Sequence, residues 1–166
     1  MIKQIIIITF ILSLISLTTA IFVDLTNDPE LQNPINKAIY KIITGEQISP
    51  ADHIKEDQIR VEGDKVVITI KNARLAAFAN TNSMDPLLDE TSNAIQIIPE
   101  SPDQIHTGDI ISYNSVQGDV VIHRVVDIRE DEEGIFYITK GDNNSKPDDE
   151  LIRFWQVRFI TVGIIY

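Results

Sequence analysis

The sequence predicts a mainly β domain that follows a single N-terminal transmembrane helix. Residues 5–23 form an uncharged apolar run, and the chain beyond residue 58 divides into short apolar segments rich in β-branched residues. Clusters of Gly, Pro, Asn and Asp separate these segments, as turns separate strands. With 166 residues and 43% hydrophobic content, the chain has room for one domain with its own core and a short appendage.

The apolar run at residues 5–23 is long enough to cross a bilayer, because a helix of this length spans roughly the 30 Å hydrocarbon core. Lys3 precedes the run, and Asp24 and Asp28 follow it. We therefore expect a single-pass protein of the cell membrane, with a cytoplasmic N-terminus and the rest of the chain outside. A cleaved secretory signal ending near Ala20 is the alternative, because small residues lie there.

Residues 24–57 are predicted to form an amphipathic helix and a linker. Asn33 can cap a helix, Pro34 suits its first position, and apolar residues then recur on one face as far as Gly45. We expect this face to pack on the domain. Binding along the membrane surface is the alternative, but the helix lacks the strongly basic polar face that this would favour.

Residues 58–166 are predicted to form the β-rich domain. No alternation of strands with helices indicates a parallel sheet, so we expect antiparallel sheets. The strands are expected at residues 58–61, 66–70, 94–98, 109–113, 120–128, 135–140 and 158–164.

The composition argues against several classes of function. A net charge of −11 disfavours nucleic acid as a partner, because phosphate binding needs clustered Lys and Arg. The absence of cysteine removes thiol nucleophiles and thiolate metal sites. The glycines form no nucleotide-binding motif, and the three histidines show no metal-ligand spacing, so we expect neither a cofactor nor a metal. A hydroxyl nucleophile remains the productive option.

Three segments carry side chains suited to that chemistry. Ser83 lies in a turn-rich sequence after an apolar segment, and His123 lies within the apolar run at residues 120–126. Asp142 and Asp148 lie in a turn-rich stretch farther along. Each has an ordinary explanation when taken alone, as a turn residue, a buried core histidine or part of an acidic loop.

Taken together, these segments resemble the type I signal peptidase family. The resemblance is carried by Ser-Met-x-Pro at residues 83–86, Gly-Asp-Ile-Ile-x-Tyr at 108–113, His-Arg-Val-Val at 123–126 and Thr-Lys-Gly-Asp-Asn-Asn at 139–144. It covers residues 75–165 and extends to the N-terminal anchor. The His-Arg pair is similar to the archaeal and endoplasmic-reticulum branch, whereas the bacterial branch has Lys-Arg at this place.

The resemblance implies a serine endopeptidase with a Ser-His-Asp triad. Ser83 would be the nucleophile and His123 the general base. An imidazole base needs a carboxylate to orient it, and the spacing favours Asp148 over Asp142 for this role.

The resemblance also implies an oxyanion hole and a peptide-binding edge. The Thr81 hydroxyl occupies the place of a second oxyanion donor beside the Ser83 N–H. Residues 75–80 are the candidate strand edge for pairing with an extended peptide. Met84 either lines a substrate pocket there or packs in the core.

Members of this family remove signal peptides from secretory precursors after small residues. The implied partners are therefore these precursors and membrane lipid, with room for accessory membrane subunits. A dedicated class of substrates is an open alternative, because residues 87–94 are more acidic than the family pattern. Two further alternatives are a non-catalytic membrane-tethered β module of peptidase descent and a regulatory self-cleaving peptidase, although relatives of the latter kind are soluble and use lysine.

Overall fold

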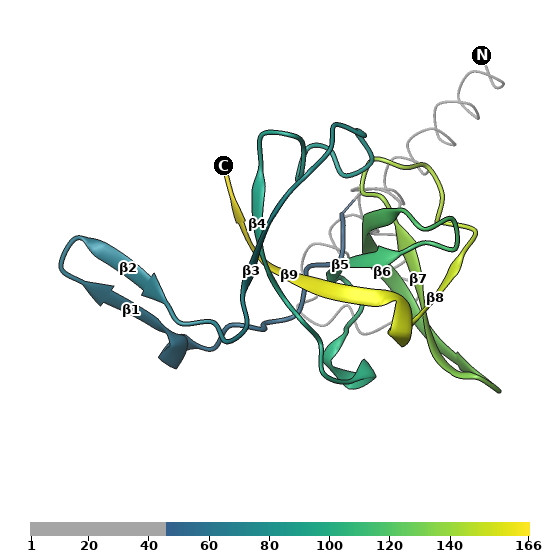
Figure 1. Ribbon diagram of the computed structural model, residues 1–166, viewed down its shortest axis with the longest axis horizontal. Coiled ribbons are helices and arrows are strands. Elements are labelled where there is room, and N and C mark those ends of the chain that lie inside the picture. Colours follow the sequence, from purple (N-terminus) through teal and green to yellow (C-terminus); the bar gives the residue numbers. More distant parts are fainter. Residues whose placement is uncertain (1–45) are drawn as a thin grey trace, which may run out of the picture. The chain divides into compact units, whose positions relative to one another are not determined.

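The computed structural model describes residues 46–166, of which Ile48–Tyr166 form one compact unit (Figure 1). The expected anchor at residues 1–23 and the expected amphipathic helix ending at Gly45 lie outside the described residues. Within the described range, no helix is long and apolar enough to cross a membrane.

The described chain is mainly β, and every strand pairing in it is antiparallel, so the predicted fold class is confirmed at this level. Its helices are single turns of 3-10 helix at Glu56–Gln58 (η1), Pro102–Gln104 (η2) and Phe154–Gln156 (η3). The strands are β1 (Ile59–Glu62), β2 (Lys65–Ile68), β3 (Arg74–Ala77), β4 (Asn93–Ile97), β5 (Ile110–Asn114), β6 (Val120–Asp131), β7 (Gly134–Lys140), β8 (Leu151–Arg153) and β9 (Val157–Ile165).

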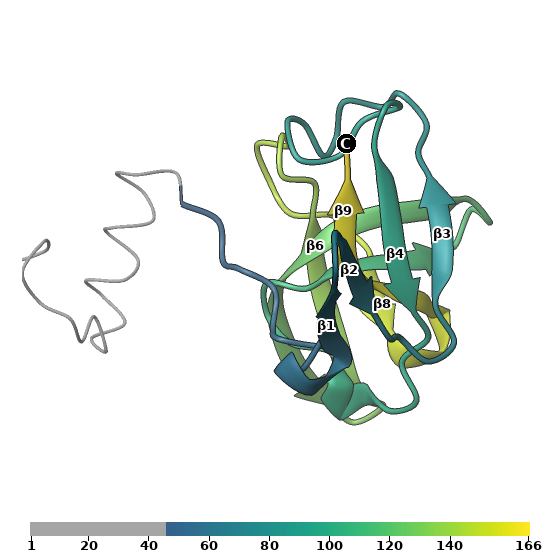
Figure 2. The same ribbon diagram turned by 90° about the vertical axis from the view of Figure 1, so that its left-hand side faces the viewer.

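The strands form a separate hairpin and a seven-stranded sheet. The hairpin β1–β2 turns at Gly63, whose φ of 65° suits glycine. The sheet has the order β3-β4-β9-β5-β6-β7-β8, so β3 and β8 are its edges. Figure 2 faces β3, β4 and β9, which lie side by side. β9 connects the two halves of the sheet, because Ile160 is paired with both β4 and β5.

Two observed strands were not among the seven expected ranges. β3 overlaps the segment at residues 75–80 that was proposed as a peptide-binding edge, and its position at the end of the sheet leaves one side of it unpaired. β8 has three residues, which is too short to show a period-2 pattern, and its pairing with β7 defines it. β6 is longer than expected because its hairpin with β7 continues to Asp131.

The main core lies between strands that are far apart in the sequence. Ile111, Val125, Tyr137, Ile152 and Ile160 come from β5, β6, β7, β8 and β9 respectively, and all are buried. Burying such side chains stabilises the fold by roughly 1.5–3 kcal/mol each. A second buried cluster of Met84, Leu88 and Ile110 lies next to the turn that contains Ser83.

The segment before β1 packs on the domain, so the compact unit begins at Ile48, ahead of the boundary expected at residue 58. The Ile48 carbonyl accepts a hydrogen bond of 3.0 Å from Arg124, and the Ala51 N–H donates one of 2.9 Å to Asp109. Gly108 passes close to Ser49, and its φ is 102°. These contacts join residues far apart in the sequence, which local patterns do not reveal.

We predict that Gly108→Ala destabilises the domain more than Gly134→Ala does. Both glycines have a φ near 100°, so each alanine incurs backbone strain of about 1–3 kcal/mol. A Cβ at Gly108 would also overlap the Ser49 carbonyl group, whereas a Cβ at Gly134 meets open space. Chemical denaturation, followed by Trp155 fluorescence, should therefore give a further loss of about 1–3 kcal/mol for Gly108→Ala. Equal losses would contradict the packing of this segment.

Candidate active site

His123 is the fourth residue of β6 and lies opposite Ile111 of β5, and its side chain is mostly buried. Its Nδ1 lies 2.6 Å from Asp148 Oδ2. When Nδ1–H donates a hydrogen bond to the carboxylate, Nε2 is the ring nitrogen left free to act as a base.

Asp148 is held in place by a small polar network. Its N–H donates to the Thr139 carbonyl at 2.8 Å. Its Oδ2 accepts hydrogen bonds from Thr139 Oγ1 at 2.7 Å and from the Tyr113 hydroxyl at 3.1 Å. Burial opposes ionisation of Asp148, but the hydrogen bonds from His123, Thr139 and Tyr113 outweigh it and lower its pKa. Burial raises the pKa of Tyr113, so its hydroxyl stays a donor.

The turn that carries Ser83 is fixed by the loop that follows β7. Asn82 has a φ of 59°, a left-handed conformation that asparagine tolerates better than most residues. Asn143 holds this turn twice, through Nδ2 to the Asn82 carbonyl at 2.9 Å and through its N–H to the Ser83 carbonyl at 3.0 Å. A Cβ at Gly141 would lie 2.5 Å from the Ser83 carbonyl oxygen, so this contact requires glycine.

Asp142 faces Arg124 rather than His123. Its two carboxylate oxygens accept hydrogen bonds of 2.7 and 2.6 Å from the Arg124 guanidinium, and both side chains are buried. The Asp142 N–H also lies 3.4 Å from Met84 Sδ. Of the two candidate carboxylates, the structure therefore brings Asp148 to the imidazole, while Asp142 braces the loop next to Ser83.

Ser83 and His123 line one cavity of about 780 Å³. The Ser83 hydroxyl is hydrogen bonded to Thr81 Oγ1 at 3.2 Å. In the part of the chain that the structure describes, no hydrogen bond joins Ser83 to His123. The absence of this hydrogen bond does not exclude the pair, because hydrogen bonds between a nucleophile and its base are often long in structures without substrate.

The remaining predicted site residues have different positions. Thr81 lines the cavity beside Ser83, as an oxyanion donor would. Met84 is buried with Leu88 and Ile110, and it is not among the residues that line this cavity. Its position is that of the simpler alternative, core packing.

Sequence reasoning missed Thr139 and Tyr113 as supports of Asp148. Both lie within the quoted motifs, but a threonine and a tyrosine in a strand look like ordinary core residues. Sequence reasoning also saw no cluster among the histidines, whereas the structure brings His53, His106 and Asp109 together. Their ligand atoms all lie within 4.8 Å of one another, which makes them candidates for holding a metal ion.

No protein-family model, curated protein or solved structure matches this chain. The functional interpretation therefore depends on the geometry of these side chains and on the short motifs that contain them.

We predict that Asp142→Asn lowers the stability of the domain by about 3–5 kcal/mol, because it leaves the buried Arg124 guanidinium without its counter-charge. Asp149 is the matched control, since its side chain is 96% exposed. Asp149→Asn should change the free energy of unfolding by less than about 0.5 kcal/mol. Urea denaturation of both variants tests this prediction, and similar small changes in both would refute it.

Proposed function

We propose that this protein is a membrane-anchored serine endopeptidase of the signal peptidase type, with Ser83, His123 and Asp148 as its triad. The observation that carries the proposal is the 2.6 Å contact between His123 and Asp148, beside a cavity that Ser83 also lines. Acyl transfer of this kind uses a nucleophile, a general base and a carboxylate that orients the base.

In the proposed reaction, His123 Nε2 removes the proton from the Ser83 hydroxyl as Oγ attacks the scissile carbonyl. The imidazolium then gives this proton to the departing amine, which breaks the C–N bond and leaves an acyl-enzyme. Water, deprotonated by the same imidazole, hydrolyses the ester and restores Ser83. Asp148 keeps its charge throughout and stabilises the imidazolium.

The oxyanion that forms during attack needs hydrogen-bond donors next to Ser83. The Thr81 hydroxyl is 3.2 Å from the Ser83 hydroxyl and lines the same cavity. The Ser83 N–H donates to no protein acceptor among the described residues, which leaves it available as a second donor. Donors of this kind stabilise the transition state more than the ground state.

The substrate would bind as an additional strand along β3. This strand is an edge of the sheet, and Ala76, Ala77 and Ala79 line the cavity together with Ser83. Their small side chains let a peptide backbone approach closely, and its alternate side chains would then point toward the cavity. This arrangement suits cleavage after small residues, as in a small-x-small site.

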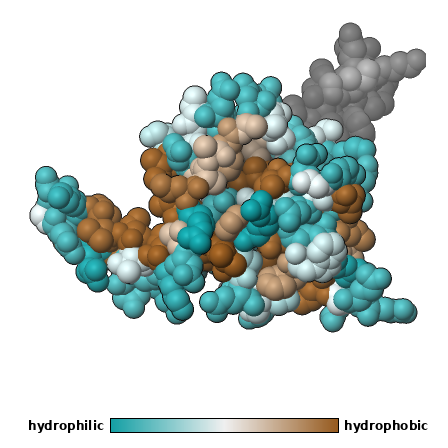
Figure 3. Space-filling model, viewed as in Figure 1, coloured by the Kyte–Doolittle hydropathy of each residue, from teal (hydrophilic) through white to brown (hydrophobic). Residues whose placement is uncertain are grey.

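Exposed hydrophobic side chains near the proposed peptide edge suit a membrane-bound substrate. Val61 and Val66 of the β1–β2 hairpin are 75% and 66% exposed, and Leu75 of β3 is 76% exposed. Figure 3 shows hydrophobic residues on the hairpin and on the neighbouring face of the domain. Together with the apolar run at residues 5–23, these side chains support a location at the extracytoplasmic surface of the cell membrane. Secretory precursors would be the substrates there.

We predict that Ser83→Ala abolishes cleavage of a precursor with a small-x-small site, with kcat falling by about 10⁶-fold or below detection. Ser101, which lies in the loop before η2, provides the control, and Ser101→Ala should keep full activity. The assay uses the full chain in detergent and follows the product by gel and mass spectrometry. Undiminished cleavage by Ser83→Ala would refute the proposal. An inactive wild-type protein would favour the non-catalytic alternative.

We predict that Asp148→Asn lowers kcat by about 10⁴-fold, because the amide no longer selects the reactive tautomer of His123. Asp149→Asn, one residue along the chain and exposed, should retain wild-type activity. Thermal unfolding of both variants shows whether the loss is a folding defect. A fully active, folded Asp148→Asn would remove Asp148 from the triad.

A further inference from the structure

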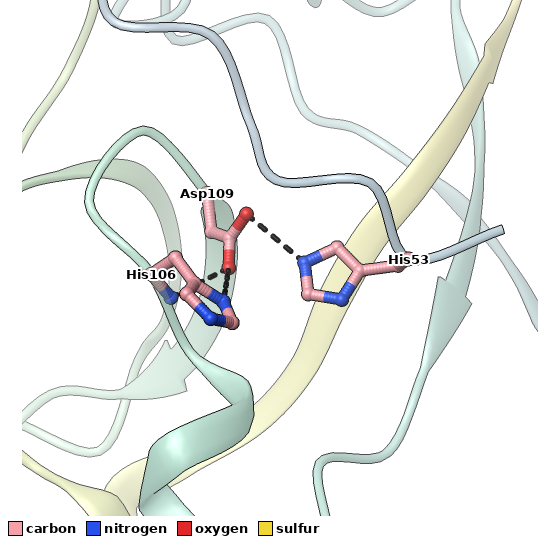
Figure 4. A group of neighbouring side chains, drawn as sticks. All are labelled: His53, His106 and Asp109. Atoms are coloured by element: carbon pink, nitrogen blue, oxygen red, sulfur yellow. Dashed lines mark hydrogen bonds and ion pairs between the residues drawn. The ribbon is translucent and has the colours of Figure 1, made fainter. Parts of the chain in front are cut away.

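A second group of titratable side chains lies at the start of β5, and the proposed peptidase chemistry does not use it. Figure 4 shows that His53 and His106 both point toward the Asp109 carboxylate. His53 comes from the segment before β1, whereas His106 and Asp109 come from the turn that precedes β5.

Asp109 is the fixed member of this group. It is fully buried, and its two oxygens accept hydrogen bonds from the Ala51 N–H at 2.9 Å and the His106 N–H at 2.8 Å. Burial opposes its ionisation, but the hydrogen bonds from His53, His106 and Ala51 outweigh burial and lower the pKa of Asp109. The group therefore contains a negative charge that is held in place.

The two imidazoles approach this carboxylate from different sides. His53 Nε2 lies 3.0 Å from Asp109 Oδ1, and His106 Nδ1 lies 3.7 Å from Oδ2. Ligands about 2.0–2.1 Å from a tetrahedral ion are separated by roughly 3.4 Å. The ligand atoms of the group all lie within 4.8 Å of one another, and the His106 side chain is 56% exposed, so its ring has room to rotate toward a shared ion.

We propose that His53 Nε2, His106 Nδ1 and the Asp109 carboxylate form a binding site for one first-row divalent metal ion, with Zn²⁺ as the preferred ion. Two imidazoles and a carboxylate are a zinc ligand set, whereas Mg²⁺ and Ca²⁺ prefer oxygen ligands alone. The histidines border a cavity of about 530 Å³, which Asp52, Glu100 and Asp103 also line. Water or one of these carboxylates would occupy the fourth position.

A simple ion pair between His53 and Asp109 accounts for only part of this arrangement. The His106 ring lies within ion-pair distance of the carboxylate but too far from it for a hydrogen bond, so no hydrogen bond to Asp109 fixes the position of this ring. The two rings lie 5.9 Å apart between centroids and are tilted by 58°, so they do not stack on each other. A shared ion explains why both rings point to one carboxylate. It would also link the segment before β1 to the turn that leads into β5.

The test is titration of the full chain, in detergent and freed of metal by a chelator, with ZnCl₂ in a calorimeter. We expect one equivalent of Zn²⁺ to bind the wild-type protein, while MgCl₂ and CaCl₂ give no saturable heat. His106→Gln should weaken zinc binding by at least about tenfold, because loss of an outer-shell partner alone costs 10–100-fold. His106 is the better position to change, since Asp109→Asn would disturb the buried backbone contacts.

His123→Gln is the matched control, because it removes the remaining histidine of the chain and leaves the proposed ligands intact. It should bind zinc like the wild type. Zinc should raise the Tm of the wild type and of His123→Gln, but not that of His106→Gln. The melting curves measured without zinc also show whether each variant folds. Absence of saturable zinc binding, unchanged binding by His106→Gln, or loss of binding in His123→Gln alone would each overturn the proposal. The readout is independent of peptidase activity.

Discussion

The buried ion pair between Arg124 and Asp142 is the interaction on which the rest of the site depends. Arg124 follows His123 on β6, so the two side chains leave the strand on opposite faces. One guanidinium nitrogen donates to the carbonyls of Ile48 and Gly108, and the others donate to Asp142. A single buried cation thus holds the segment before β1, the turn before β5 and the loop after β7.

The same pair explains why the loop after β7 is placed so closely against the Ser83 turn. Asp142 fixes the loop on one side, and its neighbours Gly141 and Asn143 contact the Ser83 turn on the other. Arginine suits this position better than lysine, because its planar fork binds a carboxylate with two parallel hydrogen bonds and keeps donors for carbonyl groups. The position of Ser83 therefore depends on a charge that lies outside its cavity.

Three largely buried carboxylates lie in the turn before β5 and in the loop after β7, although the protein is strongly acidic overall. Asp109, Asp142 and Asp148 are each paired with a basic side chain from another part of the chain. Taking a charged group out of water is costly unless hydrogen bonds compensate, and each of these groups has several. Each of these three aspartates therefore joins segments of the chain that are far apart in the sequence.

The sequence by itself determined the mainly β class, most strand positions and the residues from which a site could be built. Period-2 patterns and turn residues are local, so β5, β6, β7 and β9 could be located from them. Only the tertiary structure decided that Asp148 rather than Asp142 reaches His123, that Met84 lies in the core, and that two histidines meet at Asp109. The contacts of His123 with Asp148 and of His53 with Asp109 join residues 25 and 56 positions apart. Such pairings depend on strand order and register, which a local pattern does not contain.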